Sequence, residues 1–319
     1  MIDLITLIQT VPKSEVESIT IKNRLQTNTK GGVLYYDNVN EKFKHAYYLK
    51  IETKPVFKIK LECSLNKYYS HVTTGKQTNF DLFSFSNVIS TIKILSEKTG
   101  IDLLNMKVTY FEIGLNLYMK NDCIEYINNM ISIGAIDTKK ALFVNPKYKE
   151  ERIKTTVFHR DKKKVYKVYD KVFEMFDKNR TDAPPNLPNI LRIETTYRRI
   201  EKTTLNDLLQ PERIKKLTEQ FLKDWRTVQF ELIMQAPKGL HVSKLDLCKE
   251  ILKHGKDKVL KTEKDKLKEG KITPKIYRGL REFINTDWEQ VKKEIQFLRT
   301  EKEYEFREAL YKALKITNN

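Results

Sequence analysis

The sequence has 319 residues, a formal net charge of +18 and 40% hydrophobic residues. This length suggests two domains, or one domain with a substantial addition, and the hydrophobic content excludes a wholly disordered chain. The positive charge favours a polyanionic partner such as nucleic acid, because contacts between lysine or arginine and phosphate release counterions. The competing interpretation is an ordinary protein from a lysine-rich proteome.

Cysteine usage and hydropathy set the expected compartment. Cys63, Cys123 and Cys248 are too far apart for a paired motif, so the sequence predicts neither a disulfide framework nor a zinc site. The N-terminus carries an acid where a secretion signal needs a base, and no segment has the apolar length of a membrane span. We therefore expect a reduced, cytoplasmic protein with no membrane partner.

Strands are expected to dominate the first part of the chain. Composition or alternation marks strands at residues 1–9, 32–36, 46–62 and 107–119. Between them, residues 86–98 have apolar positions at helical spacing, with a serine before them and a glycine after them. In the strand at 107–119, Glu112 and Asn116 point to the face opposite the apolar side chains.

The second part of the chain changes from strands to helices. A helix is expected around residues 122–133, and extended segments are expected at 155–158, 164–169 and 190–198. A helix begins at Pro211 and runs past Trp225, because proline is favoured at the first helical position. Residues 285–316 again repeat apolar side chains at helical spacing.

Positive charge is concentrated in residues 253–281, which hold eleven Lys or Arg against four Asp or Glu. One interpretation is a solvated helix face. The other, which the charge of the whole chain favours, is a surface that contacts duplex DNA. The residues predicted to contact DNA are Lys253, Lys256, Lys275 and Arg278, with Lys167 and Arg192 from the first part of the chain.

Tyr169 is the candidate nucleophile, because it lies between Lys167 and Lys171 on this basic chain. A phenol has a pKa of about 10 and attacks poorly when protonated. Neighbouring ammonium groups would lower that pKa and neutralise charge on an attacked phosphate, a role we assign to Lys171. The alternative is that Tyr169 heads an apolar helical stripe with Phe173 and Phe176 and belongs to the core.

A divalent metal that polarises the phosphate would need carboxylates or imidazoles aimed at it. Glu112 and Glu194 lie on polar strand faces, and Asp3 could reach the same sheet. His159, ahead of the candidate tyrosine, could supplement a carboxylate site. Each has a plainer interpretation: a satisfied strand carboxylate, an ordinary pair of Glu194 with Arg192, or a structural histidine. Gly-rich nucleotide loops, Walker loops and serine-hydrolase elbows are absent from the sequence.

Five segments in chain order carry a family resemblance. They are Met1-Ile-Asp-Leu-Ile, then Phe57-Lys-Ile-Lys-Leu-Glu-Cys-Ser followed by Gly75-Lys-Gln-Thr-Asn, then Val108-Thr-Tyr-Phe-Glu-Ile-Gly-Leu-Asn116, Val168-Tyr-Asp-Lys-Val-Phe-Glu174 and Leu191-Arg-Ile-Glu-Thr-Thr-Tyr-Arg-Arg199. Together they resemble the replication initiators of filamentous phages, of the gene II protein type, and related rolling-circle plasmid initiators. In that family the third segment carries an acidic metal-site residue and the fourth carries the nicking tyrosine.

The resemblance implies an initiator of rolling-circle DNA replication. Tyr169 would attack an origin strand to leave a 5′-phosphotyrosine and a 3′-hydroxyl, with Mg²⁺ or Mn²⁺ held by Glu112 and with Glu194 or His159 as a further ligand. Double-stranded origin DNA, single-stranded DNA, and a host helicase and polymerase would be its partners, and a homodimer is one expected assembly. The implied fold is α+β, a mainly antiparallel sheet with helices on one face, as a nicking and joining domain over residues 1–200. Residues 201–319 would form a helical, basic DNA-binding region.

Two departures from the family pattern leave alternatives open. Glu112 stands where aspartate is usual, and Thr78-Asn79 stands where His-Asn is usual. Tyr166 is a competing or second catalytic tyrosine, since some rolling-circle initiators place two tyrosines three residues apart. A non-catalytic DNA-binding protein of the same fold and a mobilisation relaxase are the alternative functions.

Overall fold

The computed structural model describes residues 2–41, 46–80, 83–135, 138–144, 152–156, 164–177, 187–198, 200, 203–235 and 237–317. The chain forms two compact units: unit 1 is Met1–Phe230 with Glu301–Asn319, and unit 2 is Glu231–Thr300. Unit 2 is therefore an insertion in the chain of unit 1. The sequence predicts a division at residue 200 by function, into a nicking domain and a DNA-binding region. That functional division stays a prediction. Among the described residues, no helix combines the length and apolarity needed to span a bilayer.

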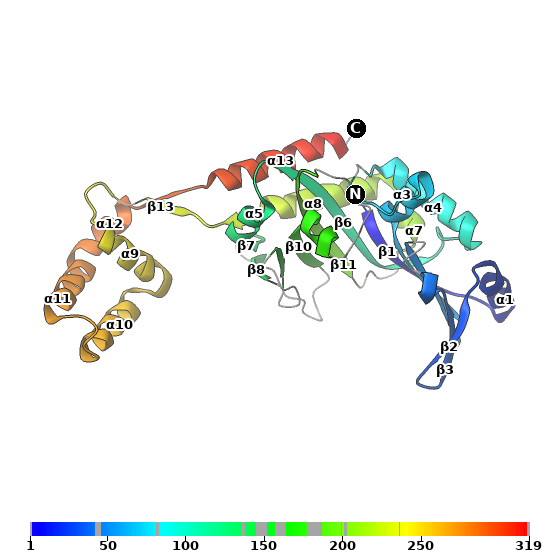
Figure 1. Ribbon diagram of the computed structural model, residues 1–319, viewed down its shortest axis with the longest axis horizontal. Coiled ribbons are helices and arrows are strands. Elements are labelled where there is room, and N and C mark those ends of the chain that lie inside the picture. Colours follow the sequence, from blue (N-terminus) through cyan, green and yellow to red (C-terminus); the bar gives the residue numbers. More distant parts are fainter. Residues whose placement is uncertain are drawn as a thin grey trace. The chain divides into compact units, whose positions relative to one another are not determined.

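Unit 1 is built on one large sheet (Figure 1). Its strands are β1 Ile2–Thr10, β2 Gln26–Lys30, β3 Val33–Asp37, β4 Tyr47–Glu52, β5 Lys58–Ser64, β6 Lys107–Met119, β7 Met130–Ile133, β8 Lys140–Val144, β9 Ile153–Thr156, β10 Lys164–Asp170, β11 Asn189–Arg198 and β12 Gln229–Phe230. They follow the order β12-β7-β8-β9-β10-β11-β6-β1-β5-β4-β3-β2, and their pairings are antiparallel. The α+β class and the large antiparallel sheet are confirmed.

The described α-helices of unit 1, with the exception of α6, contribute to one main hydrophobic core with the sheet. The described helices are α1 Lys13–Lys22, α3 Leu65–Thr74, α4 Phe85–Thr99, α5 Cys123–Asn129, α6 Lys171–Asp177, α7 Leu205–Leu208, α8 Pro211–Arg226 and α13 Glu301–Thr317, with the 3-10 turn η1 Val39–Glu41. Trp225 of α8 is fully buried, and its indole N–H donates to Thr195 of β11. Phe306 of α13 joins the same core beside Phe230. These contacts cover the apolar face of the central strands with α8 and α13.

The opposite face of the central strands is polar. Strand alternation directs Phe111 and Ile113 into the main core, so Glu112 and Asn116 point the other way. The helix α6 packs against one end of this second face, where Met175 and Ile190 form a small separate hydrophobic cluster with Phe80 and two partly buried neighbours. The sheet thus has one face for stability and a second face on which charged side chains gather.

Most of the helices and strands agree with the sequence-based predictions, and the differences have identifiable causes. The predicted strand at 107–119 and the helix from Pro211 have the expected bounds, and the helix predicted at 86–98 begins at Phe85 because Ser84 caps its first turn. The helix predicted over 122–133 is wrong in its second half: it ends at Asn129, and β7 continues the chain so that Ser132 can pair with both β8 and β12. The helices α1 and α3 lie in the part expected to be mainly strands.

Unit 2 is mainly helical. It contains α9 Val242–His254, α10 Lys256–Lys268, α11 Pro274–Glu282, the π-helix η3 Phe283–Asp287 and α12 Trp288–Glu294. The strands β13 Ile233–Gln235 and β14 Gln296–Leu298 pair at the two ends of the insertion. The helical spacing predicted over residues 285–316 is therefore interrupted by β14, which closes unit 2 before α13 returns to unit 1.

Candidate active site

Polar side chains meet on one face of the sheet where β10, β11 and β6 run side by side. The register places Tyr169 beside Arg192 and Lys167 beside Glu194. On the next strand, Asn116 lies beside Arg192. Because directly paired residues of neighbouring strands point to the same face, these side chains converge although they are far apart in sequence.

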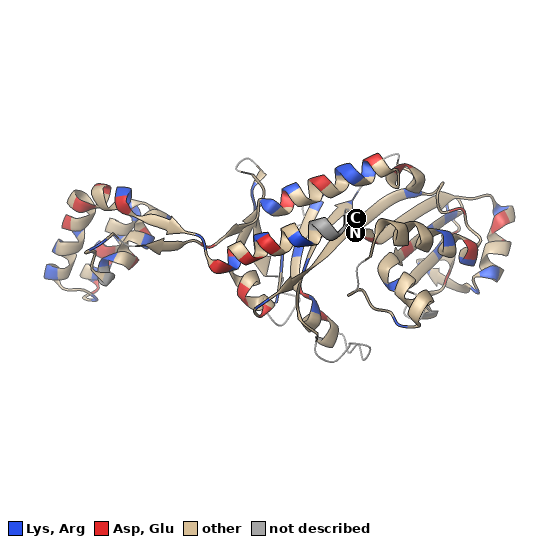
Figure 2. Cartoon of the chain, turned by 90° about the horizontal axis from the view of Figure 1, so that it is seen from above, with Lys and Arg blue, Asp and Glu red and all other residues tan. Residues whose placement is uncertain are grey.

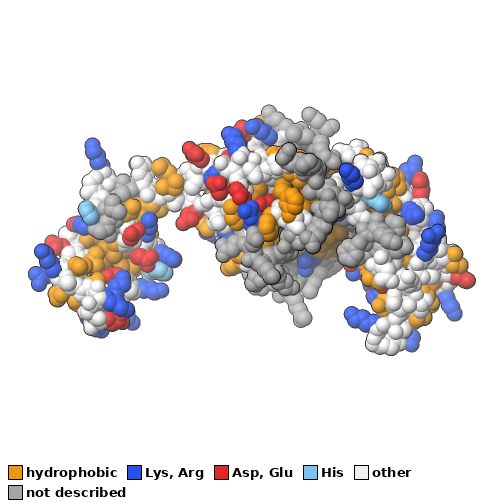
Figure 3. Space-filling model, viewed as in Figure 1, with side chains coloured by type: hydrophobic (Ala, Val, Ile, Leu, Met, Phe, Trp, Pro, Cys, Tyr) orange, Lys and Arg blue, Asp and Glu red, His pale blue; other side chains and the backbone are white. Residues whose placement is uncertain are grey.

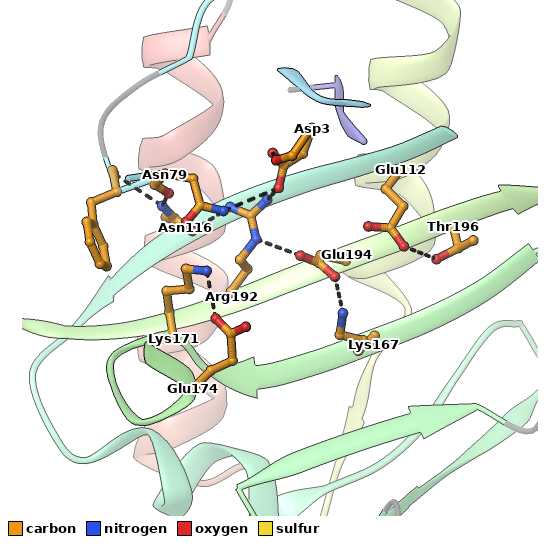
Figure 4. Close-up of polar contacts among 12 residues, drawn as sticks. Asp3, Asn79, Glu112, Asn116, Lys167, Lys171, Glu174, Arg192, Glu194 and Thr196 are labelled. Carbon is orange, nitrogen blue, oxygen red and sulfur yellow. Dashed lines mark hydrogen bonds and ion pairs between the residues drawn. The ribbon is translucent and has the colours of Figure 1, made fainter. Parts of the chain in front are cut away.

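Arg192 occupies the centre of this cluster (Figure 4). Its guanidinium donates to Glu194 Oε1 at 2.7 Å, to Asn116 Oδ1 at 2.8 Å and to the carboxylate of Asp3, which reaches in from β1. Asn79 donates to the same Asp3 carboxylate at 3.5 Å. Arg192 is only 3% exposed. Although burial disfavours its charge, Asp3 and Glu194 raise the pKa of Arg192 above its ordinary value.

Gly114 makes room for this guanidinium. A Cβ atom at position 114 would lie 2.3 Å from Nη2 of Arg192 and 2.9 Å from its Cζ, closer than real Cβ contacts allow. Replacement of Gly114 by any other residue would therefore push the Arg192 guanidinium away from Asp3 and Asn116. A glycine inside a long central strand is otherwise unfavourable, so this close approach accounts for it.

Glu194 holds the cluster together from β11. Its Oε1 accepts from Tyr169 and Arg192, and its Oε2 accepts from Lys167 Nζ at 2.6 Å. Burial favours the neutral acid, but the positive charges of Lys167 and Arg192 outweigh it and hold the pKa of Glu194 far below its usual range. The carboxylate is ionised at neutral pH and has donors at both oxygens.

Tyr169 is inside the cluster rather than in the solvent. Its hydroxyl donates to Glu194 Oε1 at 2.8 Å, and its ring lies 4.7 Å from Lys167 Nζ and 5.8 Å from Lys171 Nζ. The sequence-based expectation that the lysines lower its pKa is wrong for this arrangement. Burial and the negative charge of Glu194 raise the pKa of Tyr169 well above 10. The hydroxyl is therefore protonated while Glu194 is its partner.

Lys171 is buried where β10 passes into α6. It is 1% exposed, and its ammonium donates to Glu174 Oε2 at 2.8 Å, one turn along the helix. Burial lowers the pKa of Lys171, against the opposing charge of Glu174. Burial therefore makes the Lys171 ammonium a stronger acid than that of an exposed lysine.

Glu112 forms a second polar group on β6, next to the cluster. It accepts hydrogen bonds from the hydroxyls of Tyr110 and Thr196, the second at 3.1 Å. Burial raises the pKa of Glu112, and the negative charge of Glu194 adds to this effect. Among the described residues no lysine or arginine forms an ion pair with it.

The described residues do not by themselves fit the predicted divalent ion. Of the predicted ligands, His159 lies outside the described residues, and both oxygens of Glu194 already accept from cations. Arg192 lies between the carboxylates of Asp3 and Glu194, where an ion bridging them would lie. Within the described part of the chain, no three His, Cys, Asp or Glu side chains form a group that could hold a metal. Among the described residues, the hydrogen-bond partners of Glu112 are the hydroxyls of Tyr110 and Thr196.

Tyr166 lies on the other face of the sheet. It pairs with Thr195 rather than with a residue of the cluster, and its ring packs edge-on against Trp225 with centroids 6.0 Å apart. Its hydroxyl donates to Asp224 of α8 at 2.9 Å. The three-residue spacing from Tyr169 reverses the strand face, because side chains alternate. The structure therefore does not bring Tyr166 to the site of Tyr169.

The residues predicted to contact DNA fall into two groups. Lys167 and Arg192 belong to the cluster of unit 1, where each is ion-paired. The other predicted residues belong to unit 2: Lys253 on α9, Lys256 on α10, and Lys275 and Arg278 on α11. Of these four, Lys256 is held by Glu289 at 2.5 Å, whereas the other three have no ion pair within residues 237–317.

Three residues of the cluster were not assigned roles from the sequence. Gly114 and Asn116 lie on the same polar face of β6 as Glu112, so strand alternation alone contained the signal for Asn116. Glu174 follows from its spacing, since a residue three positions after Lys171 is its neighbour on a helix. The close approach of Arg192 to Gly114 depends on strand order, which no local pattern specifies.

In comparisons with known proteins, no family model matches this sequence, and no curated protein matches it either.

Proposed function

We propose that unit 1 nicks and rejoins a DNA strand through Tyr169, as an initiator of rolling-circle replication. The observation that carries the proposal is the hydrogen bond from the Tyr169 hydroxyl to Glu194, at the point where Lys167 and Arg192 also converge. The proposed nucleophile and two cations suited to binding a phosphate thus all contact one carboxylate, the proposed proton acceptor.

Exchange of partners would activate the tyrosine. A scissile phosphate that takes Lys167 and Arg192 away from Glu194 removes the charges that hold the pKa of this carboxylate down. Glu194 then becomes a stronger base and accepts the hydroxyl proton of Tyr169. The phenolate oxygen forms a bond to phosphorus as the bond from phosphorus to the departing 3′ oxygen breaks, and Lys171 gives that oxygen a proton. The reverse sequence rejoins the strand.

The products fit the partners implied by the resemblance. A 5′-phosphotyrosine keeps the protein attached to one end, and the free 3′-hydroxyl is a primer for a host polymerase behind a host helicase. Dependence on Mg²⁺ or Mn²⁺ stays part of the proposal, although the described residues do not form a site for the ion and none of the steps above uses it. When bound, such an ion would supply additional charge neutralisation at the phosphate.

A DNA-binding protein without this chemistry is the second candidate. The observation that favours it is the burial of Tyr169, which is 5% exposed, together with the ion pairs that occupy Lys167 and Arg192. In that case the cluster is a structural feature of the sheet, and the affinity for DNA comes from unit 2.

A nicking assay separates the two candidates. Supercoiled plasmid that carries the cognate origin is incubated with the protein and Mg²⁺ or Mn²⁺, and nicked circles with covalently attached protein are counted on denaturing gels. We expect Tyr169→Phe to abolish nicking and to keep duplex binding, with Tyr166→Phe as the matched control that still nicks. Chelation with EDTA is expected to stop nicking and to leave binding unchanged. Binding by the wild type without any nicked product would support the second candidate.

A further inference from the structure

The second half of unit 2 contains one continuous helical run that is exposed at its start and buried towards its end. The helix α11 passes through the π-helix η3 into α12 without leaving helical backbone angles. Phe283, Ile284 and Trp288 are buried in the hydrophobic core of unit 2. By contrast, α11 has no fully buried residue, and Ile276 is 51% exposed. The run is therefore anchored by its C-terminal half and presents its N-terminal half to solvent.

The helix α10 and the turn after it set where α11 begins. The helix α10 ends at Lys268, where Gly270 adopts a φ of +71° that favours glycine. Five residues separate the two helices, and α11 begins with Thr273 as its N-cap and Pro274 at its first position. Two packed helices joined by a short glycine-containing turn are the arrangement of a helix-turn-helix, in which the second helix is exposed for recognition.

Most of the cations in residues 253–281 have no ion pair within residues 237–317. Of the eleven Lys and Arg in residues 253–281, four form ion pairs, namely Lys256, Lys266, Lys268 and Lys271. Within residues 237–317, no ion pair involves the other seven, which are Lys253, Lys258, Lys261, Lys264, Lys275, Arg278 and Arg281. Figure 2 shows Lys and Arg recurring along the helices of unit 2. On the face of unit 2 that Figure 3 shows, basic side chains, with some acidic ones among them, surround hydrophobic ones.

We propose that α11 is the recognition helix of unit 2 and enters the major groove of duplex DNA. Lys275 and Arg278 would reach base edges or flanking phosphates, and exposed Ile276 would contact a thymine methyl group. Lys258 and Lys261 of α10 would hold the phosphate backbone. An α-helix with side chains has about the width of the major groove, whereas an unstacked base needs exposed aromatic faces, and the aromatic residue of α11, Tyr277, is half-buried.

A protein groove is the less suitable occupant. A helix that docks on a protein buries a long apolar stripe, but on α11 exposed Ile276 is flanked by exposed Lys275 and Arg278. The charges instead match a dense row of phosphates, where each contact releases counterions. This inference does not depend on nicking, because it concerns binding by unit 2 alone.

The salt dependence of duplex binding by the full-length protein tests whether the cations of α11 contact DNA. The probe is a fluorescent duplex of random sequence, titrated at several NaCl concentrations. We expect the double variant K275Q/R278Q to lower the slope of log K against log salt by about 2, because each phosphate contact contributes close to one unit. The matched control is K249Q/K268Q, which removes the same charge from lysines paired with Asp246 and Asp265. Equal losses in both variants would show that only net charge matters and would overturn the proposal.

Selection from a randomised duplex pool tests recognition. The wild type is expected to enrich a motif, and Arg278→Gln is expected to lose about tenfold in preference at one position of that motif. Tyr169→Phe should select the wild-type motif, which keeps this test separate from nicking. If Arg278→Gln and Ile276→Ala both select the same motif as the wild type with unchanged affinity, α11 is not the recognition helix.

Discussion

The two units use the same charged residue types in opposite ways. In unit 1, Arg192 is 3% exposed and shares two carboxylates and an amide. In unit 2, Lys275 and Arg278 lie exposed on α11 without an ion pair in residues 237–317. A phosphate can reach the exposed cations by displacing only water and counterions, whereas in unit 1 it must replace an acid. This difference supports our proposals that unit 2 supplies the affinity for DNA and that unit 1 carries the chemistry.

Removal of the central arginine should have the largest effect on stability. Arg192→Ala leaves Asp3 buried without its cation and leaves Glu194 with Lys167 alone, and we expect the free energy of unfolding to fall by about 3 to 5 kcal/mol. Arg278→Ala on α11 should leave it unchanged. Urea denaturation of both variants measures the difference. Similar losses would contradict the contrast between a buried paired array and an exposed unpaired one.

Two glycine substitutions should change stability in opposite directions. Gly114→Ala places a Cβ against the guanidinium of Arg192, and we expect a loss of about 1 to 3 kcal/mol through overpacking. Gly279→Ala meets nothing within 4 Å on exposed α11 and should stabilise that helix by about 1 kcal/mol. Thermal denaturation of the two variants is the measurement. A Gly114→Ala protein as stable as the wild type would show that Arg192 does not need the close approach.

A smaller, pH-dependent effect should distinguish the two glutamates. The pKa of Glu112 is raised in the native state, so between the ordinary carboxyl value and that raised pKa the native state binds more protons and stability falls as pH rises. Glu112→Gln should therefore stabilise the protein at pH 7 and have little effect below the ordinary carboxyl pKa. The pKa of Glu194 is lowered, so its contribution is present at pH 7, and Glu194→Gln should destabilise there. Urea denaturation at acidic and neutral pH measures the change in stability of each variant. If both variants were stabilised, or both destabilised, at pH 7, the assigned pKa directions would be contradicted.

Local sequence patterns predicted the strands that carry the site. Alternation in residues 107–119 correctly directed Glu112 and Asn116 away from the core, and the extended segment ending near Tyr169 is β10. The class of the fold followed from the same patterns, because strand and helix periodicity are local properties.

The protonation and ion pairing of the site residues depend on tertiary contacts, which local sequence patterns do not predict. The lysines beside Tyr169 suggested a lowered pKa, but Lys167 is paired with Glu194 and Lys171 with Glu174. Only the order of β10, β11 and β6 shows that Glu194 also accepts from the tyrosine. The domain insertion was likewise missed, since β13 and β14 are distant in sequence and pair through nonlocal contacts.

The covalent adduct tests the central claim most directly. A labelled pool of random single-stranded DNA is incubated with the protein and Mg²⁺ or Mn²⁺, and protein-linked DNA is purified, treated with nuclease and digested with trypsin. Cleavage after Lys164, Lys167 and Lys171 separates the two tyrosines into the peptides Val165-Tyr-Lys167 and Val168-Tyr-Asp-Lys171. Mass spectrometry is expected to find the nucleotide on Tyr169. Its presence on Tyr166, or the absence of any adduct from a pool that the protein binds, would contradict the account.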